Sequence, residues 1–226
     1  WIIGMRVVDV DGCNSKTGGR VVKNVSGYDL AKLYTGSLGS LAVISEVSFK
    51  LRADFEKIVT ARARVGSSSE ALLLTTAIRR GPFEPVSFLW TGPDNSIYIR
   101  FGDQKQAVDW QLSALPAAEW ETFEGEAEDA LWRDVRREYK ELGEIVVRLM
   151  TLPSKIERVV DQFKPDRWLA HAANGVVLLS VESADKIVEL RREFPVVIDR
   201  APIEVRRQVP AFGLNGPQYE LMKQLK

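Results

Sequence analysis

The sequence has little of what metal-binding and disulfide-stabilised proteins use. Its 226 residues include one cysteine, Cys13, and one histidine, His171, which excludes an internal disulfide framework and disfavours a zinc site. No apolar run approaches the roughly 20 residues needed to cross a bilayer, and no secretory signal is visible. The 31 basic and 31 acidic residues cancel, which argues against a nucleic-acid partner. We therefore expect a globular protein from a reducing compartment, the cytoplasm.

The length and composition fit one large domain or two small ones. Hydrophobic residues make up 45% and charged residues 27%, ordinary values for a chain that buries a core. The chain opens on an apolar strand, "WIIGMRVVDVDG", and closes on "PQYELMKQLK", a helix without a capping signal. We interpret it as a piece of a longer protein, and we expect the strand at residues 2–10 to form an exposed sheet edge.

Residues 1–52 are predicted to form one unit. Asp29 is placed to cap a short helix, and Gly36 to end it. From Leu41 onward the residues alternate, which predicts a strand with one apolar and one polar face. The predicted apolar face consists of Leu41, Val43, Val47, Phe49 and Leu51, and the polar face of Glu46, Ser48 and Lys50.

Residues 53–226 are predicted to form a second domain with an internal repeat at 56–124 and 144–199. The first half is expected to contain strand 56–65, helix 68–80, strand 84–91, strand 96–102, helix 103–114 and strand 119–124. The second half is expected to contain strand 144–151, helix 153–163, strand 166–172, strand 176–182, helix 183–194 and strand 195–199. A helix at 126–143, ended by Gly143, connects the two halves.

Both halves have the order βαββαβ, which is typical of a ferredoxin-like module. Two such modules predict an α+β fold, in which an antiparallel sheet carries helices on one face. Between strands of the second half, Asn174-Gly175 predicts a type I′ hairpin turn.

The stretch "GYDLAKLYTGSLGSLAVISEVSFKL" places Gly36 and Gly39 between a helix and a strand. Glycines without side chains let a ligand approach unpaired backbone N–H groups. The loop is not a Walker loop, because no Gly-Lys-Ser/Thr follows, and a dinucleotide fingerprint runs from strand to helix instead. The alternative is a plain glycine-rich connection.

The longer stretch "GGRVVKNVSGYDLAKLYTGSLGSLAVISEVSFKL" resembles the second FAD-binding subdomain of the vanillyl-alcohol oxidase / p-cresol methylhydroxylase flavoproteins. Within that family it is most similar to the E-type, FAD-binding subunits of glycolate oxidase. The resemblance is strong over residues 1–52. The remainder is similar in layout to the family's cap domain, "AHAANGVV" resembles a cap strand that reaches the flavin, and "YELMKQLK" resembles the family's C-terminal helix.

The resemblance implies FAD held between two subdomains, with the cap forming one wall of the substrate site. The implied cofactor-binding residues are Gly36, Ser37, Gly39, Ser40, Leu41, Val43 and Ile44. Many relatives carry Gly-Ser-Glu-Gly-Thr-Leu-Gly, from which this chain departs at Leu38, Ser40 and Ala42. A first subdomain with the main pyrophosphate-binding loop is implied to precede Trp1, so we expect the 226-residue piece alone to bind FAD weakly.

Two side chains are candidates for substrate chemistry. His171, near the end of a strand, could handle a substrate proton; the alternative is a strand histidine paired with a neighbour. Arg148, in "EIVVRLMTLP", could hold a substrate carboxylate in a bidentate pair; the alternative is a solvated strand charge.

Together the resemblance implies an FAD-dependent oxidoreductase subunit that oxidises glycolate or another small 2-hydroxy acid. The expected partners are a second flavin subunit and an iron–sulfur subunit of a glycolate oxidase-type complex, with membrane association only through those partners. The alternative is a non-catalytic assembly subunit, an interaction module that binds no flavin.

Overall fold

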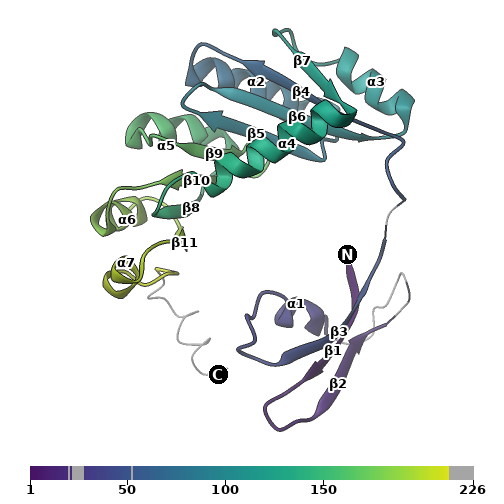
Figure 1. Ribbon diagram of the computed structural model, residues 1–226, viewed down its shortest axis with the longest axis vertical. Coiled ribbons are helices and arrows are strands. Elements are labelled where there is room, and N and C mark those ends of the chain that lie inside the picture. The colour runs from purple at the N-terminus through teal and green to yellow at the C-terminus, as the bar shows by residue number, and fades with distance from the viewer. Residues whose placement is uncertain (20, 22–27, 52, 214–226) are drawn as a thin grey trace. The chain divides into compact units, whose positions relative to one another are not determined.

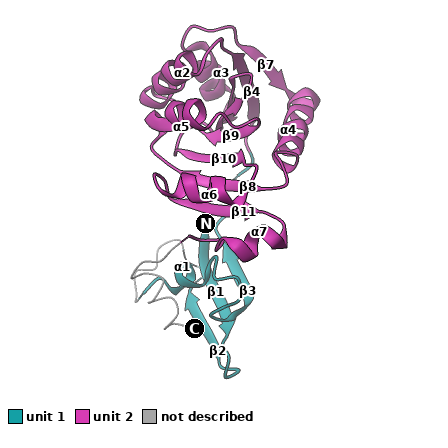
Figure 2. Ribbon diagram, turned by 90° about the vertical axis from the view of Figure 1, so that its left-hand side faces the viewer, with its two compact units in different colours: residues 1–54, 214–226 teal, residues 55–213 magenta. Residues whose placement is uncertain are grey.

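The computed structural model describes residues 1–19, 21, 28–51 and 53–213. They divide into two compact units, whose described residues lie within 1–54 and 55–213 (Figure 2). The helix expected from "YELMKQLK" lies outside the described residues, as do most residues of "RVVKNVSG". Each unit is described by itself below.

The first unit is a small antiparallel sheet with one helix. It contains β1 (Ile2–Val8), β2 (Asn14–Gly18), α1 (Leu30–Tyr34) and β3 (Val43–Phe49). The strand order is β2-β1-β3, so the expectation that residues 2–10 form an edge is wrong: β1 lies in the centre. The sequence did not predict β2, because "NSKTG" has no apolar alternation.

Strand β3 contains a bulge that changes its two faces. Glu46 pairs with Arg6 but Ile44 pairs with Val7, which leaves Ser45 as an extra residue. Strict alternation predicted that Val43 and Val47 share a face, but because of the bulge they do not. The hydroxyl of Ser45 donates a hydrogen bond to the carbonyl oxygen of Arg6 (3.2 Å).

The core of this unit is formed by Met5, Val7, Ala31 and Ala42. Helix α1 begins after Asp29 as predicted, although the Asp29 carboxylate makes no cap hydrogen bond. The Asp29 carboxylate instead forms an ion pair with Nζ of Lys32 (3.1 Å). Thr35 is the C-cap, and its N–H donates to the carbonyl oxygen of Ala31.

The second unit has a strand or helix at every place where the sequence predicts one between residues 56 and 199. Its elements are β4 (Lys57–Arg64), α2 (Ser68–Arg80), β5 (Ser87–Gly92), β6 (Ser96–Asp103), α3 (Lys105–Ser113), β7 (Glu121–Glu124), α4 (Gly125–Lys140), β8 (Val146–Met150), the 3-10 helix η1 (Pro153–Lys155), α5 (Ile156–Phe163), β9 (Trp168–His171), β10 (Val176–Ser180), α6 (Ala184–Arg191), β11 (Val196–Arg200) and α7 (Ile203–Gln208). Helix α7 was not predicted.

The eight strands form one antiparallel sheet in the order β11-β8-β10-β9-β5-β6-β4-β7. Helices α2, α3, α5 and α6 supply side chains to the larger core on one face. Helix α4 crosses the opposite face and forms a second core with it (Figure 1). The prediction of an α+β fold is confirmed, whereas α4 departs from the expectation of helices on one face.

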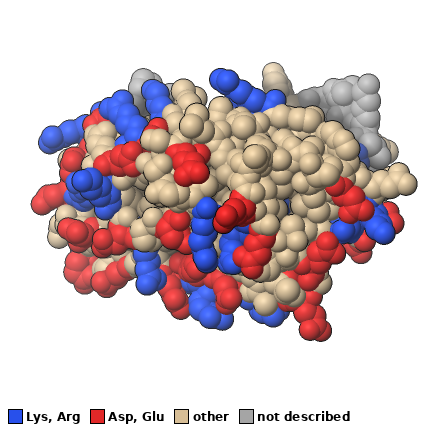
Figure 3. All heavy atoms as spheres, turned by 90° about the horizontal axis from the view of Figure 1, so that it is seen from above, with Lys and Arg blue, Asp and Glu red and all other residues tan. Residues whose placement is uncertain are grey.

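Charges of both signs lie close together on the face drawn in Figure 3, in keeping with the net charge of zero. Within the described ranges, no helix is long and apolar enough to span a bilayer.

A buried polar network fastens α4 to the sheet. The Glu128 carboxylate accepts hydrogen bonds from the Thr60 hydroxyl (2.8 Å) and from Nη2 of Arg100 (3.1 Å). Nε1 of Trp132 donates to the Thr60 hydroxyl oxygen (2.8 Å). Only 4% of the Glu128 side chain is exposed, so its charge depends on these partners.

We expect Glu128→Ala to lower the free energy of unfolding by about 2–4 kcal/mol, because it leaves the Arg100 charge without a carboxylate inside the fold. Urea denaturation followed by circular dichroism measures the change. Glu126→Ala, in the first turn of the same helix, is the matched control and should cost less than about 1 kcal/mol. Equal losses in both variants would contradict the role of the network.

Candidate functional site

The turn between α1 and β3 contains three residues in left-handed backbone conformations. Gly36, Leu38 and Gly39 have φ angles of +82°, +54° and +76°. Glycine adopts this region freely, whereas a residue with a β-carbon such as Leu38 pays about 1–2 kcal/mol. The N–H of Ser37 donates to the carbonyl oxygen of Tyr34 (3.1 Å) and closes the turn.

The turn also presents polar groups that the described part of the chain leaves without partners. The N–H groups of Gly36, Leu38 and Gly39 donate to no acceptor among the described residues, and the buried hydroxyl of Ser37 has no hydrogen-bond partner there. A β-carbon added at either glycine would meet no atom within 4 Å. Because an unpaired buried hydroxyl costs about 1–3 kcal/mol, the Ser37 hydroxyl needs a partner that the described residues do not supply.

The residues after the turn continue this open strip. Ser40 is exposed and Leu41 is half-buried, while Val43 and Ile44 are 67% and 40% exposed. Ala42 is buried in the core of the unit, so its methyl group does not face the strip. The structure thus brings the seven predicted cofactor-binding residues together in one turn and the start of one strand.

His171 and Arg148 lie on one face of the large sheet, the face that α4 crosses. His171 is opposite Val176, and Arg148 is opposite Leu178, both on β10. Strand β10 therefore lies between the two side chains, which are two strands apart across the sheet and two residues apart along it. His171 is half-buried, and the Arg148 side chain is 48% exposed.

The turn after His171 is not of the predicted type. A type I′ turn needs φ > 0 at both central residues, but only Gly175 has a positive φ (+77°), and Asn174 does not. The N–H groups of both residues donate to the carbonyl oxygen of His171, at 3.2 and 3.0 Å. A β-carbon at Gly175 would lie 1.9 Å from the carbonyl oxygen of Thr151, so the glycine is needed for close approach as well.

Arg148 is held by groups from two other elements. Its Nη2 donates to Oδ1 of Asp199 on β11 (2.5 Å), and the Tyr139 hydroxyl on α4 donates to Oδ2 of the same carboxylate (3.0 Å). Burial raises the pKa of Tyr139, and its hydrogen bond to Asp199 raises it further. Tyr139 therefore remains a hydrogen-bond donor at neutral pH.

The pKa of His171 is lowered from its ordinary value of 6.5. Burial is the larger cause, and the positive charge of Arg148 is the second. The imidazole is therefore neutral at pH 7, and one of its ring nitrogens can accept a proton.

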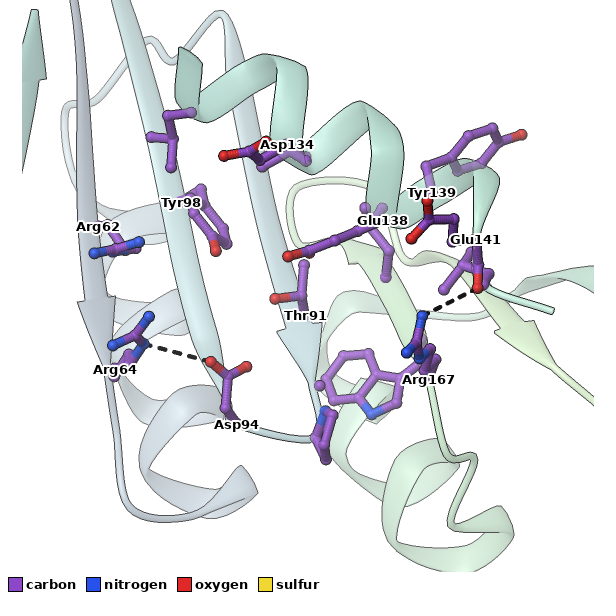
Figure 4. Close-up of a pocket in the computed structure, with 17 residues that line it drawn as sticks. Arg62, Arg64, Thr91, Asp94, Tyr98, Asp134, Glu138, Tyr139, Glu141 and Arg167 are labelled. Carbon is purple, nitrogen blue, oxygen red and sulfur yellow. Dashed lines mark hydrogen bonds and ion pairs between the residues drawn. The ribbon is translucent and has the colours of Figure 1, made fainter. Parts of the chain in front are cut away.

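A cavity of about 470 Å³ lies on the same sheet face and contains none of the predicted site residues. Figure 4 shows Arg62 and Tyr98 on one wall and Asp134 and Glu138 of α4 on the other. Tyr139 also lines it, with the hydroxyl pointing away from the other labelled side chains (Figure 4). At the edge of the cavity, Arg64 pairs with Asp94. Nη1 of Arg167 donates to the carbonyl oxygen of Glu141 (3.2 Å). The apolar lining of the cavity consists of Pro93, Leu131, Val135, Leu142, Trp168 and Leu169.

The carboxylates around this cavity act on its titratable groups. Burial raises the pKa of Glu138, and the charges of Asp94 and Asp134 raise it further. Burial likewise raises the pKa of Tyr98, with Glu138 as the second cause.

Comparison with known proteins gives four results. No family model matches the chain. It is 34% identical over 100 residues to glycolate oxidase subunit GlcE of Escherichia coli, a match that covers 44% of this chain and 28% of that protein. It is 43% identical over 51 residues to glycolate oxidase subunit GlcD of Bacillus subtilis, covering 23% and 11%. An FAD-linked oxidoreductase of Mycobacterium tuberculosis is 25% identical over 217 residues, covering 78% and 46%.

The chain is homologous to FAD-linked oxidoreductases. The resemblance predicted from the glycine-rich stretch is thereby confirmed. A solved structure of alkyldihydroxyacetonephosphate synthase shares the fold, with a TM-score of 0.56 and 15% identity over 99% of this chain and 51% of that one. The chain spans less than half the length of the curated relatives it matches.

The residues of the turn fit an FAD cofactor. The pyrophosphate and the flavin carbonyls accept hydrogen bonds, and the turn offers three N–H groups and the Ser37 hydroxyl. The open space over Gly36 and Gly39 leaves room for such a group to come close. Among the described residues, no group of three or more His, Cys, Asp or Glu side chains could hold a metal ion.

Sequence reasoning missed Asp199, Tyr139 and the cavity. Tyr139 lies in the charged run "RREYKE", which reads as an exposed helix face, although the tyrosine packs against the second core. Asp199 lies near the end of the apolar strand β11 and belongs to no motif. Its contact with Arg148 depends on the pairing of β11 with β8, which puts Val197 opposite Arg148, and no residue pattern marked that register.

Proposed function

We propose that this chain is part of an FAD-dependent oxidoreductase that oxidises a small 2-hydroxy acid, with glycolate as the first candidate substrate. The observation that carries the proposal is the turn at Gly36–Leu41 in a homologue of FAD-linked oxidoreductases. Its N–H groups and the Ser37 hydroxyl, which have no partner among the described residues, suit this cofactor. The name of the Escherichia coli relative supports glycolate.

The chain's own residues have separate roles in this proposal. The turn and the start of β3 bind the cofactor. When bound, FAD supplies the acceptor for the hydride that leaves the alcohol carbon. Arg148 binds the substrate carboxylate through N–H groups that Asp199 does not use, and neutral His171 accepts the proton of the substrate hydroxyl.

The same proposal assigns an architecture to the second unit. Its halves have the strand orders β5-β6-β4-β7 and β11-β8-β10-β9 within the sheet. In each, the first strand is central and pairs with the third and fourth, which is the order of a ferredoxin-like module. We propose that residues 53–226 are a cap domain of two such modules, which meet where β5 pairs with β9.

The substrate is tested by a panel of acids on the purified full-length protein. We expect dye reduction with glycolate and with lactate, and none with acetate or propionate, which lack the hydroxyl group. Reduction by none of the 2-hydroxy acids, in a protein that contains FAD, would contradict the substrate class.

We propose further that the protein works in a glycolate oxidase-type complex with a second flavin subunit and an iron–sulfur subunit, because two relatives are named as subunits. Tagged full-length protein, purified gently from its own cells, should co-elute with two such partners in size-exclusion chromatography. Elution alone, at the mass of its own chain, would overturn this assembly.

A further inference from the structure

Asp199 occupies a special position in β11. The neighbouring residues Ile198 and Arg200 pair with Val147 and Val146, which leaves Asp199 as the extra residue of a β-bulge. Asp199 nevertheless keeps the face of Val197, two residues earlier, which pairs with Arg148 on β8. Here each carboxylate oxygen receives one donor: Oδ1 accepts from Arg148 and Oδ2 from Tyr139.

We propose that Asp199, fixed by Tyr139, is a positioning residue that keeps Arg148 on the sheet face beside His171. The inference rests on the proposed function and adds to it two residues that touch neither substrate nor cofactor. Its physical basis is that Arg148 is anchored from outside its own strand, by Asp199 of β11 and, through that carboxylate, by Tyr139 in the last turn of α4.

An anchor is needed because arginine loses much side-chain entropy when it is held in one conformation. The Arg148 side chain is half exposed, and without a partner it would extend into water. Asp199 uses one N–H of the guanidinium at Nη2, and a guanidinium has five. The remaining donors stay available for a carboxylate, so Asp199 holds the guanidinium in place and leaves N–H groups for the substrate.

His171 is a reporter of where Arg148 lies. The charge of Arg148 acts on it across β10. On the other side of β9, β5 places Leu89 opposite His171, and Arg100 on β6 is paired with Glu128 of α4. Arg148, which is paired with Asp199, is thus the charge that acts on the imidazole.

The first test measures the pKa of His171 by NMR in the full-length protein, without substrate. The signal is identified by its loss in His171→Gln. Arg148→Met should raise the pKa, because a nearby positive charge is removed. Asp199→Asn should raise it too, because Arg148 then moves away into water. Asp109→Asn, which breaks the ion pair with Lys57, is the matched control and should leave the pKa unchanged.

The test is decided by whether the His171 pKa rises or falls in Asp199→Asn. Loss of the Asp199 charge alone would lower the His171 pKa, since a negative charge favours the imidazolium. A lower or unchanged pKa in Asp199→Asn would show that Arg148 stays in place without its anchor and would overturn the proposal. If Asp199→Asn does not fold, Tyr139→Phe replaces it in the test, because this change removes one of the two donors to Asp199. The His171 pKa should again rise, and a lower or unchanged pKa would again overturn the proposal.

The second test separates binding from turnover. With glycolate, Asp199→Asn should raise KM about tenfold and change kcat less than about threefold, because carboxylate binding is what the anchor supports. Tyr139→Phe should raise KM less, and should add nothing in the Asp199→Asn background, because both act through one carboxylate. Additive effects would contradict the linked roles. If no 2-hydroxy acid is turned over, the proposed function fails, whereas the NMR test still decides the positioning.

Discussion

Gly39→Val is expected to abolish FAD retention by the full-length protein, with at least a hundredfold loss of affinity, while the fold remains. Gly39 has a φ of +76°, which a β-branched residue strongly resists. Its side-chain position opens onto free space rather than onto protein. Valine would therefore fill open space over the turn, where we propose that the cofactor binds. Flavin absorbance per protein, measured after gel filtration, quantifies the loss.

Gly12 offers a closely matched control for this variant. It has a φ of +77°, and a β-carbon there also meets nothing within 4 Å, but it lies in the turn between β1 and β2. Gly12→Val thus imposes the same backbone strain outside the proposed site and should keep its FAD. Wild-type flavin content in Gly39→Val, or equal losses in both variants, would show that the turn does not hold the cofactor.

His171→Gln is expected to lower kcat with glycolate by about a hundredfold or more, the usual contribution of a positioned general base. The neutral imidazole accepts the proton of the substrate hydroxyl in our proposal, and a glutamine amide cannot. Steady-state kinetics of the full-length protein measures the loss. Arg158→Met, which removes a surface arginine paired with Glu193, should leave kcat unchanged. A His171→Gln variant within threefold of wild type would refute the role.

The pH dependence follows from the direction of the His171 shift. Because burial and Arg148 lower the pKa below 6.5, kcat/KM should stay high as the pH falls through the ordinary histidine range. Its acid limb should move to higher pH in Arg148→Met. Protonation of His171 acts against folding. Because the unfolded state binds the proton more tightly than the folded state, His171 lowers the free energy of unfolding as the pH falls below about 6.5.

The sequence predicted the second unit well because its elements follow the local rules. Ser67 and Ser183 accept hydrogen bonds from the N–H groups of Glu70 and Lys186, which begins α2 and α6 near the predicted places. The strands of the large sheet are short apolar runs between turn residues. The glycine-rich turn was also predictable, because Gly36 and Gly39 both adopt the positive φ that glycine permits.

Features that depend on pairing between strands could not be predicted. Strand β2 forms on polar residues because β1 offers it backbone partners, and the bulges at Ser45 and Asp199 depend on the register with a neighbouring strand. The position of α4 is similar: the helix was predicted and its stop at Gly143 was visible in the sequence, but which sheet face it covers follows from contacts such as Glu128 with Thr60. The Asp199 anchor was invisible for the same reason.

The most direct test of the central claim is anaerobic addition of glycolate to the purified full-length protein, observed in the visible absorption band of the flavin. We expect that the protein carries FAD, that glycolate bleaches the band, that acetate does not, and that dithionite gives the same final spectrum as glycolate. A protein without a flavin spectrum would contradict the assignment of the turn to FAD. A flavin spectrum that dithionite bleaches and glycolate leaves intact would contradict the proposed oxidation.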